Sequence, residues 1–250
     1  KPDIRFGMKI TNLKSPVKRK GAIEADGFII ANAGFPVFDN AETVLAIAVP
    51  GGATWTRKQF DELTDWVKRP QVGMQGLGYI RCNEDGSLKS SIDKFYPEEK
   101  LKAIAGFVHA EKGEAILILA GREEKTRKAI SDLRLELGER LGLRKKEEFK
   151  LLWVIDFPLF EYSEDDNRWV ARHHPFTAPK DGHETLFETD PGQAIAKAYD
   201  VVLNGWEIGG GSVRIHKPDI QQKVFAALGI PPEDQQRKFG FLLKALQFGA

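Results

Sequence analysis

Apolar residues in the first half of the chain follow two patterns that predict strands and helices in turn. Short apolar runs at 43–49, 78–82 and 115–120 are typical of buried strands, and the first two end at glycine-containing turns. Between and after them, apolar residues at helical spacing predict helices over 57–68, 98–110 and 123–141. Thr54 is the expected cap of the first helix. The alternation predicts strands backed by helices on at least one face.

The pattern changes near 142–150, where a run of five charged residues over 144–148 is typical of a solvated linker. A strand beginning at Trp153, further β segments and two helices follow. Asp219 is the expected cap of a helix over 220–228, and 231–233 opens the last helix. That helix should turn these apolar residues inward: Phe239, Leu242, Leu243 and Leu246. We therefore expect an α+β fold with two domains, an α/β-type domain over 1–146 and an antiparallel sheet with flanking helices over 147–250.

A β-hairpin is the strongest local prediction in the second domain. Asn204-Gly205 separates two alternating runs, and this dipeptide is the best short-range signal for a two-residue hairpin turn. With that turn, Leu203 pairs with Trp206, Val202 pairs with Glu207, and Asp200 lies opposite Gly209. One face of the hairpin is then apolar, and we expect it to face the core. Its residues are Tyr199, Val201, Leu203, Trp206 and Ile208.

Two carboxylates share the other face of this hairpin. Asp200 and Glu207 form a diagonal pair, about 7–8 Å apart at the backbone, and the hairpin offers them no nearby cation. A divalent cation would relieve their repulsion, and Mg²⁺ is usually held by one or two carboxylates together with substrate phosphates. The glycines at 209–211 would leave the adjacent backbone open to a ligand. The alternative interpretation is a solvated face carrying two independent acids.

Arg214 lies seven residues after Glu207, an odd number that would place the two side chains on opposite faces of an unbroken strand. A bulge within 209–211 would return Arg214 to the carboxylate face. Its guanidinium suits a bidentate grip on a carboxylate or phosphate. The alternative is a surface arginine paired with some acid.

His173 and His174 follow a short apolar run. Because neighbours on a strand point to opposite faces, they cannot easily ligate one metal together. We expect one ring to face a pocket, where it can donate to a carboxylate or titrate near neutral pH, and the other to pack. A pair of purely structural histidines is equally compatible with the sequence.

The composition of the chain argues against several classes of protein. The 250 residues carry 37 Lys and Arg against 36 Asp and Glu, so bulk charge does not hold this protein to nucleic acid or a membrane. Cys82 is the only cysteine, which excludes an intramolecular disulfide and strongly disfavours a cysteine-based zinc site. No apolar run approaches the roughly 20 residues needed to span a bilayer.

Several long, ordered strings together resemble the bacterial-type aspartyl-tRNA synthetase family, a class II family. They are WVIDFP at 153–158, HHPFT at 173–177, PKD at 179–181, AYDVVLNGWEIGGGSVRIH at 198–216, and FGFLL at 239–243, continuing through 248–249. The first domain is similar to the GAD insertion domain of that family, with Pro50-Gly51-Gly52 and the following helix matching it. The resemblance covers essentially the whole chain.

The resemblance implies an ATP-dependent aminoacyl-tRNA ligase that converts aspartate and ATP to aspartyl-adenylate and then charges tRNA. By resemblance, Asp200 and Glu207 hold Mg²⁺ on the ATP phosphates, and Arg214 binds the aspartate side-chain carboxylate. His173 and His174 would lie on a loop beside the amino acid, and Ser212 is a further candidate there. The resemblance also implies a homodimeric parent enzyme, no membrane partner and, with no signal peptide in the first residues, a cytoplasmic location.

The chain departs from the family pattern because the class II motifs 1, 2 and 3 and the anticodon-binding barrel are not found in it. We therefore expect an internal segment that is inactive alone, with exposed edges on its second-domain sheet. The competing hypothesis is a non-catalytic binding module of the GAD type, which the complete carboxylate hairpin disfavours. A metal hydrolase built on Asp200, Glu207 and His173 is weaker, since it lacks a nucleophile and enough ligands.

Overall fold

The computed structural model describes residues 1–14, 18–19, 22–23, 30, 34–246 and 248. The chain divides into two compact units, Phe6–Lys145 and a second unit made of Lys1–Arg5 with the residues from Lys146 onward. The first five residues, which the sequence analysis grouped with the first domain, therefore pack with the second unit. We call these the N-terminal unit and the C-terminal unit.

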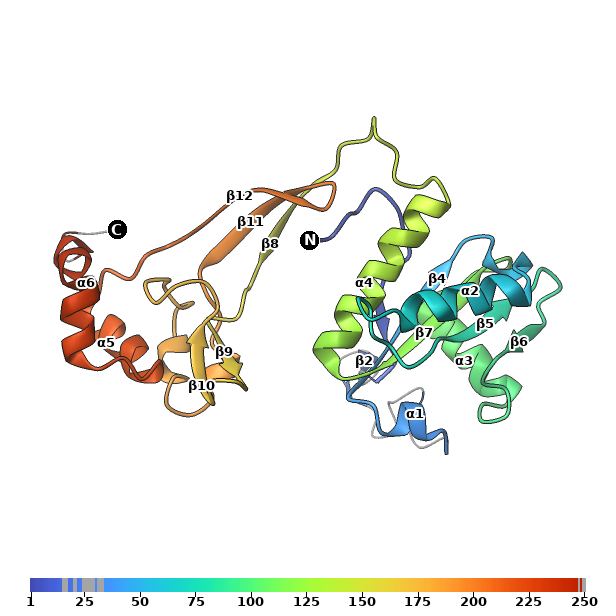
Figure 1. Ribbon diagram of the computed structural model, residues 1–250, viewed down its shortest axis with the longest axis horizontal. Helices are drawn as coiled ribbons and strands as arrows, with labels where there is room; N and C mark the ends of the chain where they lie inside the picture. The colour runs from blue at the N-terminus through green and yellow to red at the C-terminus, as the bar shows by residue number, and fades with distance from the viewer. Residues whose placement is uncertain (15–17, 20–21, 24–29, 31–33, 247, 249–250) are drawn as a thin grey trace. The chain divides into compact units, whose positions relative to one another are not determined.

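A five-stranded antiparallel sheet organises the N-terminal unit (Figure 1). Its order is β1 (Thr11–Asn12), β4 (Thr43–Val49), β7 (Ala115–Gly121), β5 (Gly78–Cys82) and β6 (Leu88–Ser90). A separate pair is formed by β2 (Lys18–Arg19) and β3 (Ala22–Ile23). The three strands expected in this region are confirmed, and the α+β class is confirmed with them. The alternation of strands and helices thus builds an antiparallel sheet here.

Helices cover both faces of that sheet. The helices are α1 (Pro36–Asp39), α2 (Arg57–Lys68), α3 (Glu98–Val108) and α4 (Glu123–Arg140), with a 3₁₀ turn η1 (Gly52–Thr54). On β4, Leu45 and Ile47 pack with α2 and α4, whereas Val44 and Ala46 pack with α1 and α3. Both faces of this strand are therefore buried, which explains why its sequence is an unbroken apolar run.

The cap of α2 is Thr56, not Thr54 as expected. Thr56 accepts from the backbone of Gln59, and the Gln59 side chain accepts from the backbone of Thr56, which completes a capping box. Thr54 instead ends η1, where its hydroxyl donates to Gly51 O at 2.8 Å. The prediction missed that a short 3₁₀ turn separates the strand from the helix.

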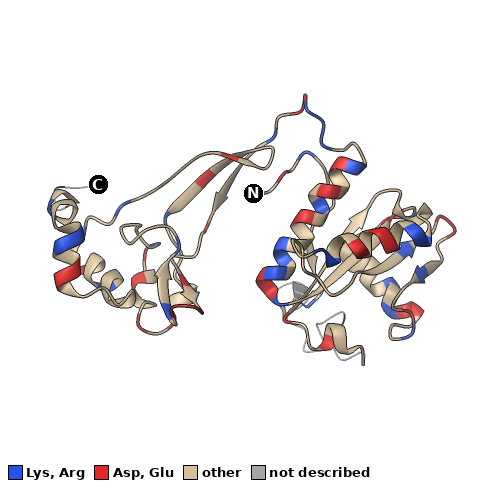
Figure 2. Ribbon diagram, in the orientation of Figure 1, with Lys and Arg blue, Asp and Glu red and all other residues tan. Residues whose placement is uncertain are grey.

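Charged residues of both signs alternate along α4 (Figure 2). Glu123 pairs with Arg127, and the same four-residue spacing pairs Lys128 with Asp132 and Glu136 with Arg140. The exposed face of this helix is thus a mixed-charge surface. Among the described residues, no helix combines the length and apolar character needed to cross a bilayer.

The C-terminal unit contains a three-stranded antiparallel sheet of order β12-β11-β8 (Figure 1). Its strands are β8 (Leu151–Ile155), β11 (Ala198–Leu203) and β12 (Trp206–Ser212), and a hairpin is formed by β9 (Phe160–Ser163) and β10 (Arg168–Ala171). Asn204 and Gly205 have φ values of 51° and 87°, so both residues of the predicted turn are left-handed, as a type I′ turn requires. The remaining elements are the 3₁₀ turns η2 (His183–Thr185) and η3 (Pro191–Gln193) and the helices α5 (Pro218–Ala227) and α6 (Pro232–Leu246).

Helix α5 begins two residues earlier than expected. Lys217 occupies its cap position, Pro218 opens it, and Asp219 lies in the first turn rather than at the cap. Proline at this position costs no hydrogen bond, because the first amides of a helix have no intrahelical partner. On α6, Phe239 stacks on Phe225 of α5 with ring centroids 5.9 Å apart, so this residue of the predicted inward face is in contact. Leu242, Leu243 and Leu246 are half-buried.

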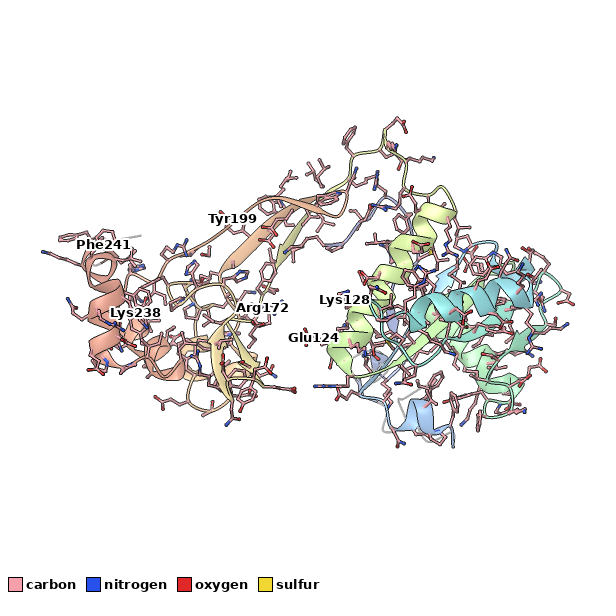
Figure 3. The ribbon with its side chains drawn as sticks, viewed as in Figure 1. Glu124, Lys128, Arg172, Tyr199, Lys238 and Phe241 are labelled. Atoms are coloured by element: carbon pink, nitrogen blue, oxygen red, sulfur yellow. The ribbon has the colours of Figure 1, made fainter. Side chains whose placement is uncertain are left out.

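The hairpin face expected in the core is exposed. Trp206 is 74% exposed and Tyr199, labelled in Figure 3, is 43% exposed, whereas Asp200 and Val202 on the opposite face are buried. The register of β8 continues this surface, which we call the exposed apolar face. It consists of Leu151, Trp153, Ile155, Tyr199 and Trp206. Alternation identifies the residues that share a face, but the packing of other elements decides which face is covered.

Candidate functional site

The candidate site is built on the β11–β12 hairpin, whose register differs from the prediction by one residue. Leu203 pairs with Trp206 and Val202 with Glu207, as expected. The register then shifts, so that Asp200 lies opposite Gly210 rather than Gly209. The extra residue is Ile208, which forms a bulge just before the glycine run instead of within it.

This bulge changes which residues share the carboxylate face. Beyond it, Gly210 and Ser212 pair with Asp200 and Ala198, so even-numbered residues of β12 follow the Asp200 face. Arg214 comes two residues later, where it bridges Thr177. The bulge therefore returns Arg214 to the side of the carboxylates, as predicted, but it lies earlier in the strand than the predicted position.

Asp200 and Glu207 share one cation, and it comes from the start of the chain. The Lys1 ammonium contacts Asp200 Oδ2 and lies 3.2 Å from Glu207 Oε2. The Asp200 residue is only 7% exposed, and the Glu207 side chain is 47% exposed. The hydrogen bond to Asp200 is the main cause that raises the pKa of Lys1 above its usual value. Sequence spacing could not reveal Lys1, because it is 199 positions away from Asp200.

The carboxylate pair fits a magnesium ion only as part of a larger set of ligands. Lys1 demonstrates that a single cation reaches oxygens of both side chains. Within the described residues, no group of three or more His, Cys, Asp or Glu side chains is placed to hold a metal. Mg²⁺ is usually bound by one or two carboxylates, and phosphate and water oxygens fill the remaining coordination positions. Asp200 and Glu207 therefore supply donors of the right kind and number for that ion.

The glycine run beside the pair is less open than the sequence suggested. A Cβ at Gly210 would lie 2.6 Å from Asp200 Oδ1, and one at Gly211 would lie 2.7 Å from the Tyr199 hydroxyl. Only Gly209 of the three has open space around its missing Cβ. Two of these glycines therefore make room for side chains of the neighbouring strand rather than for a ligand.

Arg214, His174 and Ser212 form a second cluster at the end of β12. Arg214 Nη1 donates to His174 Nδ1 at 2.9 Å, and Ser212 Oγ lies 3.4 Å from His174 Nε2. Burial lowers the pKa of His174, and electrostatic interaction with Arg214 and then with the neighbouring His173 lowers it further. His174 is thus a neutral acceptor for the guanidinium near neutral pH. Among the described residues, His174 is the only side chain that forms a hydrogen bond with the Arg214 guanidinium, and Arg214 itself is exposed.

His173 lies in the loop after β10 and not on a strand as expected. Its ring is exposed and packs edge-on against Phe157, with centroids 5.0 Å apart. The Lys1 ammonium lies 5.1 Å from the centroid of the same Phe157 ring. Phe157, which the sequence analysis did not single out, therefore links the histidine loop to the carboxylate pair. Because residues 173 and 174 lie in a loop, their side chains do not have to point to opposite faces as strand neighbours do. His173 contacts Phe157 and His174 contacts Arg214, so both histidines lie near the site.

A cavity of about 140 Å³ adjoins Arg214. Its charged lining residues are Asp181, Glu184, Lys197, Arg214 and Lys217. Two of them form an ion pair, in which Lys197 Nζ donates to Asp181 Oδ1 at 2.7 Å. Thr177, which pairs with Arg214, is also missed by the motif analysis, although it lies in the same HHPFT string as His174.

Comparison with known proteins connects this site to a family. The family model for tRNA synthetases class II (D, K and N) matches residues 1–250. The chain is 50% identical over 251 residues to the aspartate–tRNA ligase of Parabacteroides distasonis, covering 100% of this chain and 41% of that protein. It is 50% identical over 250 residues to the enzyme of Flavobacterium psychrophilum, with the same coverage. For Porphyromonas gingivalis the identity is 49% over 251 residues, covering 100% of this chain and 40% of the relative.

The chain thus spans about two fifths of the length of these relatives. The family match extends over every residue, including the hairpin, the histidine loop and the N-terminal unit. The resemblance drawn from the sequence strings is confirmed at the level of the family. This protein belongs to the class II tRNA synthetases of the D, K and N group.

Proposed function

We propose that this chain is a part of an aspartyl-tRNA synthetase, in which it contributes the binding site for the aspartate side chain and the carboxylates that hold Mg²⁺. The observation that carries the proposal is the Arg214 guanidinium, held by His174 at one edge and otherwise exposed. It lies two residues beyond β12, the strand that carries Glu207 of the Asp200–Glu207 pair. The relatives are named aspartate–tRNA ligases, which supports aspartate as the substrate.

Arg214 is suited to distinguish aspartate from asparagine. His174 accepts from only one guanidinium nitrogen, so the other N–H groups remain for a two-point grip on a carboxylate. An asparagine amide would offer one acceptor and would turn its own N–H groups toward those of the arginine. Because an unmatched donor in a binding site costs more than a missing contact, the amide is rejected. The neutral His174 keeps the guanidinium oriented and adds no competing charge.

Asp200 and Glu207 would hold the magnesium ion, which supplies charge neutralisation for the ATP phosphates when bound. Glu207 is half exposed and can reach outward to an ion, while the buried Asp200 is fixed over Gly210. His173, exposed beside Phe157, and Ser212, next to His174, complete the proposed amino-acid side of the site. These residues bind and orient the reactants, and positioning supplies much of the acceleration in such transfers.

In the proposed reaction the aspartate α-carboxylate attacks the α-phosphorus of ATP and pyrophosphate leaves. The resulting aspartyl-adenylate then passes its acyl group to the terminal adenosine of tRNA, and AMP leaves. We propose that the parent enzyme is a cytoplasmic homodimer and that its GAD-type insertion domain is the N-terminal unit, Phe6–Lys145. Because the chain spans about two fifths of its relatives, we expect no activity from the chain by itself.

The test is aspartate-dependent exchange of pyrophosphate into ATP. The 250-residue chain is compared with the same chain joined at both ends to the flanking sequence of the Parabacteroides distasonis relative. Exchange by the lengthened protein and not by the chain alone is the expected result. A lengthened protein that folds but catalyses no exchange would overturn the proposal and favour the non-catalytic module.

A further inference from the structure

We propose that Lys1 is an internal counter-ion of the Asp200–Glu207 pair and competes with a divalent cation for it. The inference rests on the proposed magnesium site and adds a residue that regulates its occupancy. Its basis is the position of the ammonium group, which bonds to Asp200 Oδ2 and lies 3.2 Å from Glu207 Oε2. A cation that bridges these two oxygens must take the space that Nζ occupies.

The backbone next to Lys1 is held against the hairpin turn. A Cβ at Gly205 would lie 3.3 Å from the Asp3 Cβ and 3.5 Å from the Lys1 carbonyl oxygen. Asp3 is 1% exposed and its carboxylate is bound by Arg5 Nη2 at 2.7 Å. Lys1 is therefore presented to the carboxylates by an anchored segment, and its position does not depend on the side chain alone.

The Lys1 side chain is also enclosed on its way to the carboxylates. Its ammonium lies 5.1 Å from the centre of the Phe157 ring, within the range of a cation–π contact, and the side chain is 30% exposed. The same ring packs against His173. The ammonium is thus lodged between two carboxylates and an aromatic face, which is a defined cation site rather than a chance surface ion pair.

The charges explain why such a counter-ion is useful. Two carboxylates that face one cation carry a total charge of −2, and the Lys1 ammonium reduces this to −1. Without a cation, the two side chains would repel each other and separate. Lys1 therefore keeps the pair assembled while no metal is bound, and its displacement is a cost that a metal must overcome. Removing the ammonium should consequently strengthen metal binding.

The experiment measures Mn²⁺ binding to the full 250-residue chain from the electron paramagnetic resonance signal of the free ion. K1M removes the charge and keeps the side-chain length, whereas K1R retains the charge as a matched control. We expect K1M to bind Mn²⁺ about tenfold more tightly than the unchanged chain, as expected when one unit charge is removed at a partly exposed site. K1R should stay within about twofold, and K1M carrying D200N and E207Q should lose the tight site.

Equal or weaker Mn²⁺ binding by K1M would overturn the inference, and K1Q provides a second neutral variant if K1M does not fold. Absence of Mn²⁺ binding in both the unchanged chain and K1M would overturn it as well, together with the metal role of the pair. Failure of the proposed function has a different signature. In that case K1M still tightens Mn²⁺ binding, but the lengthened protein catalyses no aspartate-dependent exchange.

Discussion

Arg214 Nη1 lies 2.9 Å from His174 Nδ1, and this contact determines which ring nitrogen carries the proton. A guanidinium only donates, so Nδ1 must be the acceptor. The backbone N–H of Phe176 also donates to Nδ1, at 3.2 Å. The neutral ring therefore carries its proton on Nε2, which lies 3.4 Å from Ser212 Oγ. A histidine in this tautomer orients the arginine without opposing it.

The first prediction concerns the titration of His174. Its pKa is lowered by burial, by Arg214 and by His173, so the folded protein gives up the ring proton more readily than the unfolded chain. Between the ordinary pKa near 6.5 and the lower folded value, the unfolded state binds more protons. Stability should therefore decrease as the pH falls through this window. Nitrogen-15 NMR should give the lowered pKa and an unprotonated Nδ1, and H174Q should lose this part of the pH dependence of urea unfolding.

The second prediction tests the two-point grip of Arg214. R214K keeps the charge but cannot present two parallel donors, so we expect about a hundredfold lower kcat/KM for aspartate in the lengthened protein. Discrimination against asparagine should fall at the same time. The measurement is pyrophosphate–ATP exchange with each amino acid. K223R, a charge-preserving change on the exposed side of α5, is the matched control and should leave both values unchanged.

Much of the fold follows from local patterns, and the exceptions have physical causes. The Asn204-Gly205 turn could be predicted because a type I′ turn needs two left-handed residues, and few dipeptides provide them. The bulge at Ile208 could not be placed, since any residue near the glycines would have satisfied the pattern. The prediction of which hairpin face is buried was wrong for a different reason. Burial depends on elements distant in sequence, which periodicity does not contain.

The candidate site shows the same division. Asp200 and Glu207 belong to one hairpin, so the alternation of strand residues was enough to place them on one face. Arg214 joined them only with an assumed bulge, and Ser212 only through the family resemblance. Lys1 comes from the other end of the chain and joins them only through tertiary packing. No local sequence pattern relates residues that are 199 positions apart.

The third prediction separates the roles of two neighbouring glycines. An alanine Cβ at position 210 would lie 2.6 Å from Asp200 Oδ1 and 3.1 Å from the Tyr199 carbonyl oxygen. G210A should therefore destabilise the C-terminal unit by about 1–3 kcal/mol and weaken Mn²⁺ binding by displacing the carboxylate. G209A is the control, because nothing lies within 4 Å of its Cβ position. Equal effects of the two changes on thermal unfolding would contradict the packing seen at Gly210.

The fourth prediction distinguishes two threonines near the start of α2. Thr56 forms the capping box with Gln59, so T56A should destabilise the N-terminal unit by about 1 kcal/mol. Thr54 makes only an exposed hydrogen bond within η1, and T54A should cost less. Urea unfolding followed by the helical circular dichroism signal measures both. A larger loss from T54A would show that the helix begins at the earlier residue.

The last prediction concerns the exposed apolar face of the C-terminal unit. Trp206 is 74% exposed and Trp153 is 64% exposed, on a contiguous apolar surface of the β12-β11-β8 sheet. Such surfaces promote association, so the 250-residue chain should bind the dye ANS and self-associate in sedimentation velocity at micromolar concentration. W206K should reduce both effects, because a charge on this surface opposes its burial. F241K is the matched control, since Phe241 is 85% exposed on α6, outside this face. If F241K reduced association as much as W206K, a general gain in charge would be responsible and the sheet face would not be the contact.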